Sequence, residues 1–199
     1  MNIDDACAPH GLFVMGSVRD ITLIGAGAGM WPAFTAAPEY HDGQANPLDR
    51  WSKRVIGGIA DTFCGSAVFP SDGPPYAPFI AWAKDTGRFW NSPTGMLVHD
   101  VAGLMISIRG ALVLPGVTAL PAVMDSPCSA CAAPCVDGCP VGALSAEAAY
   151  DVPACKAYLA TTDGADCMGA GCLVRRACPV SAAFQRDPAQ SAFHMQAFL

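Results

Sequence analysis

Cys128-Ser-Ala-Cys131-Ala-Ala-Pro-Cys135-Val-Asp-Gly-Cys139-Pro140 is a stretch of four closely spaced cysteines that ends in Cys-Pro. Four more cysteines follow it, and the last of them is again followed by a proline; they are Cys155, Cys167, Cys172 and Cys178, before Pro179.

The amino terminus is acidic and no apolar signal segment follows it, which predicts a cytosolic protein. In a reducing compartment, clustered cysteines are more often metal ligands or catalytic thiols than disulfides.

The number and spacing of these cysteines indicate iron–sulfur clusters. Eight thiolates are the ligands of two [4Fe–4S] clusters, and the bacterial ferredoxin run is C-x2-C-x2-C-x3-C-P. The first group here has one extra residue and the second group is wider, but the cost of closing a loop grows slowly with its length. Because Cys₄ sites also bind zinc, a zinc-binding or cluster-free domain stays open as an alternative.

The fourth cysteine of the ferredoxin run ligates the other cluster. This crossed pattern predicts two ligand sets. The first cluster would use Cys128, Cys131, Cys135 and Cys178, and the second would use Cys139, Cys155, Cys167 and Cys172.

Composition limits the classes of partner. The chain has 199 residues, of which 52% are hydrophobic and 14% charged, with a formal net charge of −6. The low charge predicts a folded core, and the lack of a basic patch argues against nucleic-acid binding. The longest apolar stretch, Val101 to Leu114, is too short to span a membrane. We expect an acidic protein that docks to a basic redox partner, and its apolar carboxyl-terminal tail is compatible with a homodimer.

Composition also changes along the chain near Pro121. All four tryptophans precede it, whereas eight of the ten cysteines follow it. We therefore predict an α/β domain at residues 1–122 and an iron–sulfur domain at residues 123–199. The fold class expected for the whole chain is α/β, of the α+β type.

Local patterns predict regular secondary structure in five segments. Asp20–Ile24 suits a buried strand, and Leu48–Phe63 has apolar residues at helical spacing after Asn-Pro. A second helix is expected from Phe79, ending near Gly87. Val101–Leu114 is predicted as two buried strands or a helix plus a strand, and Val141–Ala149 as a helix that Pro140 opens.

Several other residues are weaker candidates for a function. The glycine-rich turn at Gly25–Gly29 lacks the third glycine of a dinucleotide fingerprint, so we interpret it as structural, with a cofactor cleft as the alternative. Neighbouring residues of a strand point to opposite faces, which argues against His99-Asp100 as an acid–base pair. Cys7 and Cys64 are expected to be buried apolar thiols. Arg175 and Arg176 would raise the potential of the adjacent cluster.

The segment from Cys128 to Leu144, with Ala154-Cys155-Lys-Ala-Tyr158-Leu159, resembles the ferredoxin-like region of epoxyqueuosine reductases and reductive dehalogenases. The resemblance covers about residues 125–180. It implies two [4Fe–4S] clusters that pass electrons to a cobalamin held by a nitroreductase-like domain. Segments of the amino-terminal part are similar to that cobalamin-linked group; they are Leu23–Gly27, Met30–Phe34 and Asn46–Asp49.

The sequence thus predicts an electron-transfer protein with two [4Fe–4S] clusters, the redox component of a reductase system. A small reductase that uses a corrinoid or flavin in residues 1–122 is one alternative, although no corrin ligand or catalytic acid is identified. A degenerate relative that binds zinc or no metal is the other.

Overall fold

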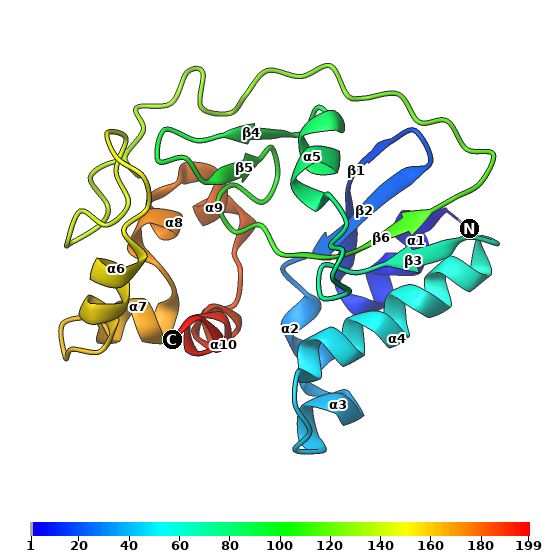
Figure 1. Cartoon of the computed structure of the whole chain (residues 1–199), viewed down its shortest axis with the longest axis horizontal. Helices are drawn as coiled ribbons and strands as arrows, with labels where there is room; N and C mark the ends of the chain where they lie inside the picture. The colour runs from blue at the N-terminus through cyan, green and yellow to red at the C-terminus, as the bar shows by residue number, and fades with distance from the viewer. Residues whose placement is uncertain (1) are drawn as a thin grey trace. The chain divides into compact units, whose positions relative to one another are not determined.

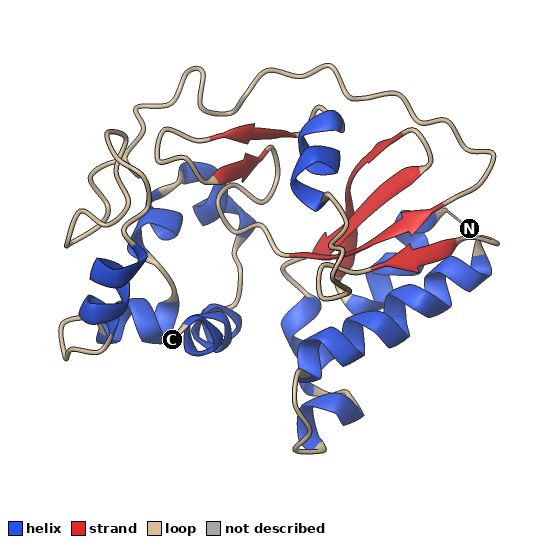
Figure 2. Cartoon of the chain, viewed as in Figure 1, coloured by secondary structure: helices blue, strands red, loops and turns tan. Residues whose placement is uncertain are grey.

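The computed structural model describes residues 2–199, and it confirms the mixed α/β class (Figures 1 and 2). The chain forms two compact units. Unit 1 comprises the residues up to Phe89 together with Ser107–Met124, and unit 2 comprises Trp90–Ile106 together with Asp125–Leu199. Each unit is therefore built from two separate segments of the chain.

Unit 1 is built on a four-stranded antiparallel sheet in the order β1-β2-β6-β3. The strands are β1 (Leu12–Val18), β2 (Ile21–Ala26), β6 (Ile108–Val113) and β3 (Ser66–Val68). All six residues of β2 are buried, as expected for a central strand without alternating polarity. The predicted strand at Asp20–Ile24 is thus confirmed.

Unit 1 also contains helices and a 3₁₀ turn at Ala8–His10. The helices are α1 (Ile3–Cys7), α2 (Met30–Thr35), α3 (Pro38–His41), α4 (Pro47–Thr62) and α5 (Phe79–Asp85). The two predicted helices are confirmed. In α4, apolar side chains at helical spacing, including Trp51, Val55 and Ile59, are buried, and the helix packs on β3 and β6. Within residues 2–199, every helix is too short or too polar to cross a lipid bilayer.

The glycine-rich turn after β2 is structural. A Cβ on Gly11 would lie 2.1 Å from the carbonyl carbon of Gly29, so only glycine permits this approach. The Gly27 amide donates to the Gly11 carbonyl (2.8 Å) and the Met30 amide donates to the Gly27 carbonyl (3.2 Å). These two amides therefore already have partners within the turn, which supports the interpretation of the turn as structural.

Unit 2 contains a short hairpin and five helices. The hairpin is β4 (Phe89–Asn91) with β5 (Leu97–His99), and the helices are α6 (Val152–Leu159), α7 (Ala165–Ala170), α8 (Leu173–Ala177), α9 (Pro179–Phe184) and α10 (Pro188–Phe198). Its apolar cluster includes Val98 and Leu104 beside the cysteines, which explains why Trp90–Ile106 belongs to this unit. The chain passes from unit 1 to unit 2 for the second time after Met124, close to the predicted domain boundary. The sequence did not indicate that Trp90–Ile106 also belongs to unit 2.

Two predicted elements are wrong. Val141–Ala149 is not helical: Gly142 has a φ of +64°, and the Ser145 hydroxyl accepts hydrogen bonds from the amides of Glu147 and Ala148, which competes with helix formation. In Val101–Leu114, only β6 is regular, because the residues before it form buried turns.

Candidate metal centre

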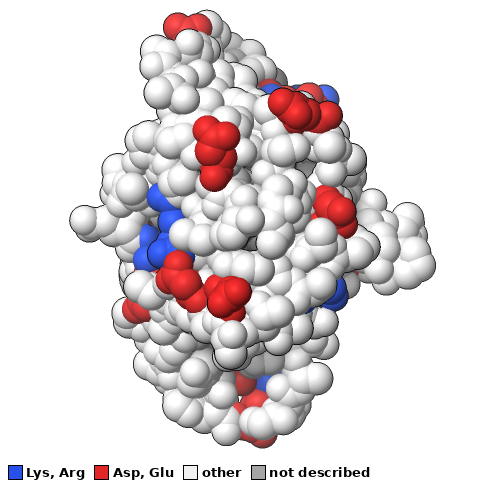
Figure 3. Space-filling model, turned by 90° about the vertical axis from the view of Figure 1, so that its left-hand side faces the viewer, with Lys and Arg blue, Asp and Glu red and all other residues white. Residues whose placement is uncertain are grey.

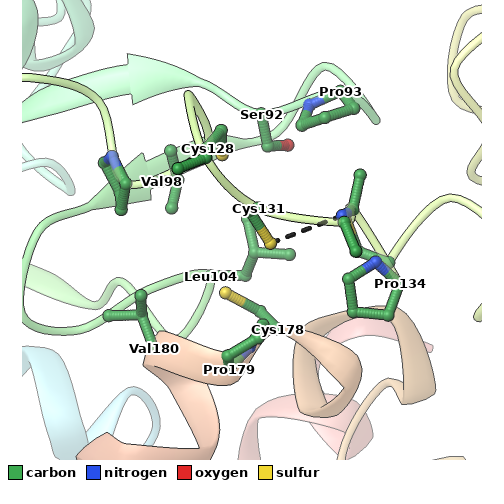
Figure 4. Close-up of a pocket in the computed structure, with 15 residues that line it drawn as sticks. Ser92, Pro93, Val98, Leu104, Cys128, Cys131, Pro134, Cys178, Pro179 and Val180 are labelled. Atoms are coloured by element: carbon green, nitrogen blue, oxygen red, sulfur yellow. Dashed lines mark hydrogen bonds between the residues drawn. The ribbon is translucent and has the colours of Figure 1, made fainter.

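Four cysteines of unit 2 line one cavity of about 380 Å³, and they are Cys128, Cys131, Cys135 and Cys178. These are the four residues predicted to hold the first cluster. In Figure 4, the side chains of Cys131 and Cys178 point toward each other across the cavity, and Val98 and Leu104 form part of its wall. Three of the cysteines come from the loop after residue 127, whereas Cys178 is the residue before the first turn of α9.

Burial and proximity affect these thiols together. Burial raises the pKa of the Cys128 thiol, a hydrogen bond with Ser126 opposes this shift, and the neighbouring Cys178 and Cys131 raise the pKa further. Burial likewise raises the pKa of Cys135, with the other three thiols of the cavity as additional causes. The Cys131 sulfur accepts a hydrogen bond from the Ala133 amide (3.4 Å), which fixes the loop locally. Cluster binding would therefore need to deprotonate this set, as metal binding to thiols does.

The wall of the cavity is held by a turn around His99. This histidine is fully buried, and its Nδ1 accepts hydrogen bonds from the amides of Val101 and Ala102 (both 3.1 Å). Its Nε2 lies 3.1 Å from Oδ1 of Asp100. The expectation that these neighbours point apart is wrong, because β5 ends at His99 and the chain turns there. With Nδ1 occupied as an acceptor, the imidazole is neutral with its proton on Nε2, and its role is structural.

The same turn contacts the helix that follows Cys178. The Leu104 amide donates to the Ser181 hydroxyl (2.7 Å), and Ser181 lies in the first turn of α9. Gly103 has a φ of +56°, and a Cβ there would lie 2.4 Å from the Ser181 nitrogen. The close approach fixes the position of α9, and with it the position of Cys178.

The other four predicted ligands come from different elements of unit 2. Cys139 is in a loop, Cys155 in α6 and Cys167 in α7, and Cys172 precedes α8. Burial raises the pKa of Cys167, with Cys172 as a further cause. Burial and contact with Cys155 raise the pKa of Tyr150, to which Cys172 also contributes. Cys167 is thus a neighbour of Cys172, and Tyr150 is a neighbour of both Cys155 and Cys172.

One apolar cluster joins the two cysteine sets. It contains Cys135 and Cys178 among its buried residues, and Cys128, Cys139 and Cys172 pack against it. The side chains between them are aliphatic or aromatic and exclude water; they include Val98, Leu104, Leu144 and Val174, which are at most 4% exposed. Members of both ligand sets therefore contact the same apolar cluster.

A buried amide lies on the helix that packs on α7. Gln190 of α10 is completely buried, and among residues 2–199 neither its Nε2 nor its Oε1 has a hydrogen-bond partner. Helix α10 packs on α7, which carries Cys167. Buried polar groups are normally paired, so the Gln190 amide is an exception among the described residues.

The donor set and shared cavity of the first four thiols fit a [4Fe–4S] cluster. Within residues 2–199, no three His, Cys, Asp or Glu side chains converge as the ligands of a single metal ion would. A Zn²⁺ with bonds of about 2.3 Å would need four sulfurs within about 4 Å of one another. The thiols of a cubane bind four different irons and so surround a cavity, which is the arrangement of Cys128, Cys131, Cys135 and Cys178.

The remaining candidates lie outside the cavity. Cys7 is buried, and burial, with a smaller contribution from Asp4, raises the pKa of its thiol to about 12. Cys64 is exposed, so the expectation of a buried thiol is wrong there. The sequence did not indicate His99, Ser181 or Tyr150 as part of the site, because their roles depend on packing between distant segments.

No protein-family model matches this chain, and no curated protein or solved structure is significantly similar to it. The class of the site therefore rests on its own geometry.

Proposed function

We propose that this protein carries two [4Fe–4S] clusters and transfers single electrons as the redox component of a reductase system. The observation that supports this best is the shared cavity of the four thiols predicted for the first cluster, to which Cys178 is contributed from a distant part of the chain. Cys139, Cys155, Cys167 and Cys172 would hold the second cluster. When bound, the clusters accept and release one electron at a time.

The chain's own residues would position and shield the clusters. The His99 turn and Ser181 fix Cys178, and the cluster of apolar side chains covers part of the surroundings of both ligand sets. Burial of this kind is one of the means by which a protein sets a cluster's potential. Because both ligand sets contact one apolar cluster, the two metal centres would lie close enough for electrons to pass between them.

The net charge and the free cysteines suggest a kind of partner protein and a cellular compartment. The formal net charge is −6, and two oxidised clusters with eight thiolates would bring it to about −10. The face drawn in Figure 3 is mostly uncharged, with scattered acidic side chains and basic ones in small groups. We expect docking to a basic partner protein. All ten cysteines are free thiols, which suits the cytosol.

Anaerobic purification with iron and acid-labile sulfide counts tests the proposal. We expect a brown protein with about eight irons and eight sulfides per chain. Cys131→Ser should lose about half of both, whereas Cys64→Ser, at an exposed cysteine outside the site, should lose none. A colourless protein without sulfide that cannot be reconstituted would refute the proposal. Zinc alone, or a bound corrinoid or flavin, would support the alternatives.

A further inference from the structure

The backbone of Leu104 is bound by two side chains that flank Cys178 in the sequence. The Leu104 amide donates to the hydroxyl of Ser181, three residues after Cys178 (2.7 Å). The Leu104 carbonyl accepts a hydrogen bond from Nη1 of Arg175, three residues before Cys178. Leu104 and Cys178 both line the first cavity, and Figure 4 shows their side chains there. The wall of the cavity is therefore held, on both sides, by the segment that carries one of the proposed ligands.

The turn around Leu104 also has hydrogen bonds that do not involve Arg175. The amides of His99 and Gly103 each donate to the carbonyl of the other residue (both 2.9 Å). Arg186 donates through Nη2 to the carbonyl of Met105. Loss of the Arg175 contact should therefore loosen Leu104 while the turn stays folded. Because Leu104 is only 1% exposed, the loss leaves a buried carbonyl without its charged donor, which is costly.

Arg176, the next residue in the chain, has partners beside the second set of cysteines. Its Nη2 forms an ion pair with Asp166, the residue before Cys167. Its Nε donates to the carbonyl of Gly171, the residue before Cys172 (3.0 Å). One guanidinium thus joins two segments, and each of them carries a ligand predicted for the second cluster.

The different partners of the two arginines follow from the geometry of α8. This helix has only five residues, and it lies between Cys172 of the second set and Cys178 of the first. Successive residues of an α-helix are about 100° apart around its axis, so adjacent side chains leave the helix in different directions. Arg175 and Arg176 therefore contact different segments of unit 2, although they are adjacent in the sequence.

We propose that these two arginines are positioning residues for different metal centres. Arg175 secures Leu104 to the segment that carries Cys178, at the first site. Arg176 secures the segment from Cys167 to Cys172, at the second site. Each arginine would act through the backbone and side chains that it binds, as the groups around metal ligands commonly do, and neither would contact a cluster. This inference rests on the proposed function.

Iron release to an iron(II) chelator tests this inference in the anaerobic, cluster-loaded full chain, with one cluster present at a time. Cys167→Ser should keep only the first cluster and Cys131→Ser only the second, with about four irons per chain in each. Arg175→Met removes the donor but keeps a long side chain. It should speed iron release at least about tenfold in the Cys167→Ser background, because a charged hydrogen bond stabilises by more than that factor. Release in the Cys131→Ser background should not change.

Arg176→Met is the matched comparison and should act only in the Cys131→Ser background. Its effect should be smaller, about two- to fivefold, because the ion pair with Asp166 is largely exposed. Arg175→Lys keeps a charged donor and should restore most of the slow release at the first site. The EPR spectrum of the reduced first cluster should change in Arg175→Met, because the wall beside it moves, and should return in Arg175→Lys.

The outcomes separate this inference from the proposed function. Equally faster release in both backgrounds would mean that Arg175→Met only destabilises unit 2, and it would overturn the inference, as would unchanged release in both. If Arg175→Met does not fold, Ser181→Ala removes the other hydrogen bond of Leu104, and unchanged release from its Cys167→Ser form would likewise overturn the inference. These results leave the proposed function standing, whereas absence of iron and sulfide from the unaltered chain would overturn both.

Discussion

Replacing Gly103 by alanine should disturb the position of Cys178 without touching any cysteine. The new Cβ would lie 2.4 Å from the Ser181 nitrogen and 2.6 Å from its hydroxyl oxygen, and both atoms belong to the first turn of α9. A non-glycine residue at a φ of +56° costs about 1–2 kcal/mol. Overpacking against the helix backbone adds about 1–3 kcal/mol.

Gly95→Ala is the matched control in the same unit. Gly95 has a φ of +77°, but a Cβ added there would meet no atom within 4 Å, so this variant should lose only the conformational part. Gly103→Ala should therefore be less stable than Gly95→Ala by about 1–3 kcal/mol. In anaerobic thermal unfolding this difference corresponds to a midpoint lower by about 2–12 °C.

The metal content gives a second measurement. Because α9 carries Cys178 at its start, moving the helix should weaken the first site, and iron should fall from about eight toward about four per chain. Gly95→Ala should keep its full content. If the two variants have equal unfolding midpoints and equal iron, the reasoning that Gly103 and Ser181 position Cys178 is wrong.

Three further predictions concern other parts of the chain. Burial raises the pKa of the Cys7 thiol from 9.0 to about 12. The contribution of this thiol to the free energy of unfolding is therefore complete below pH 9 and is lost as pH rises toward 12. Cys7→Ala should reduce the loss of unfolding free energy at alkaline pH by about 4 kcal/mol. A hydrogen bond from Arg54 lowers the pKa of Glu39; Glu39→Gln should therefore destabilise the protein at neutral pH, and denaturant curves should converge with wild type as pH falls below 4.5. Gln190→Leu should raise the free energy of unfolding of the metal-free protein by about 1–2 kcal/mol, since it removes unpaired buried atoms, and a lower value in denaturant titrations would contradict this.

The sequence predicted the elements whose signals are local. Helix α4 combines Asn-Pro at its start with apolar residues at helical spacing, and β2 is a continuous apolar run before glycines. The helix predicted for Val141–Ala149 is wrong because Gly142 and the Ser145 hydroxyl favour turns over the helix that the local sequence suggested. Such competition depends on single side chains and is not visible in periodicity.

The cysteines of the candidate site could be identified from their spacing, but their surroundings could not. Val98 and Leu104 lie far from Cys128 in sequence, and no pattern connects them before the chain is folded. The turn that holds them depends on hydrogen bonds between the imidazole of His99 and two backbone amides, a tertiary detail. Likewise, Arg175 and Arg176 are adjacent and chemically identical, and only their partners distinguish them.

The division of unit 2 into two segments has a consequence for biosynthesis. Trp90–Ile106 leaves the ribosome before the rest of unit 1 is made, yet it packs with residues that follow Asp125. The set of four thiols that line the cavity is complete only once Cys178 has been made, well after Cys128, Cys131 and Cys135. The proposed cluster would therefore be loaded only after Cys178 has been made, and until then a nascent chain would expose the other thiols and the apolar side chains of Val98 and Leu104. Assembly of the proposed centre would thus be a step that follows synthesis of all its ligands, and a protein made faster than it is loaded would accumulate with that surface uncovered.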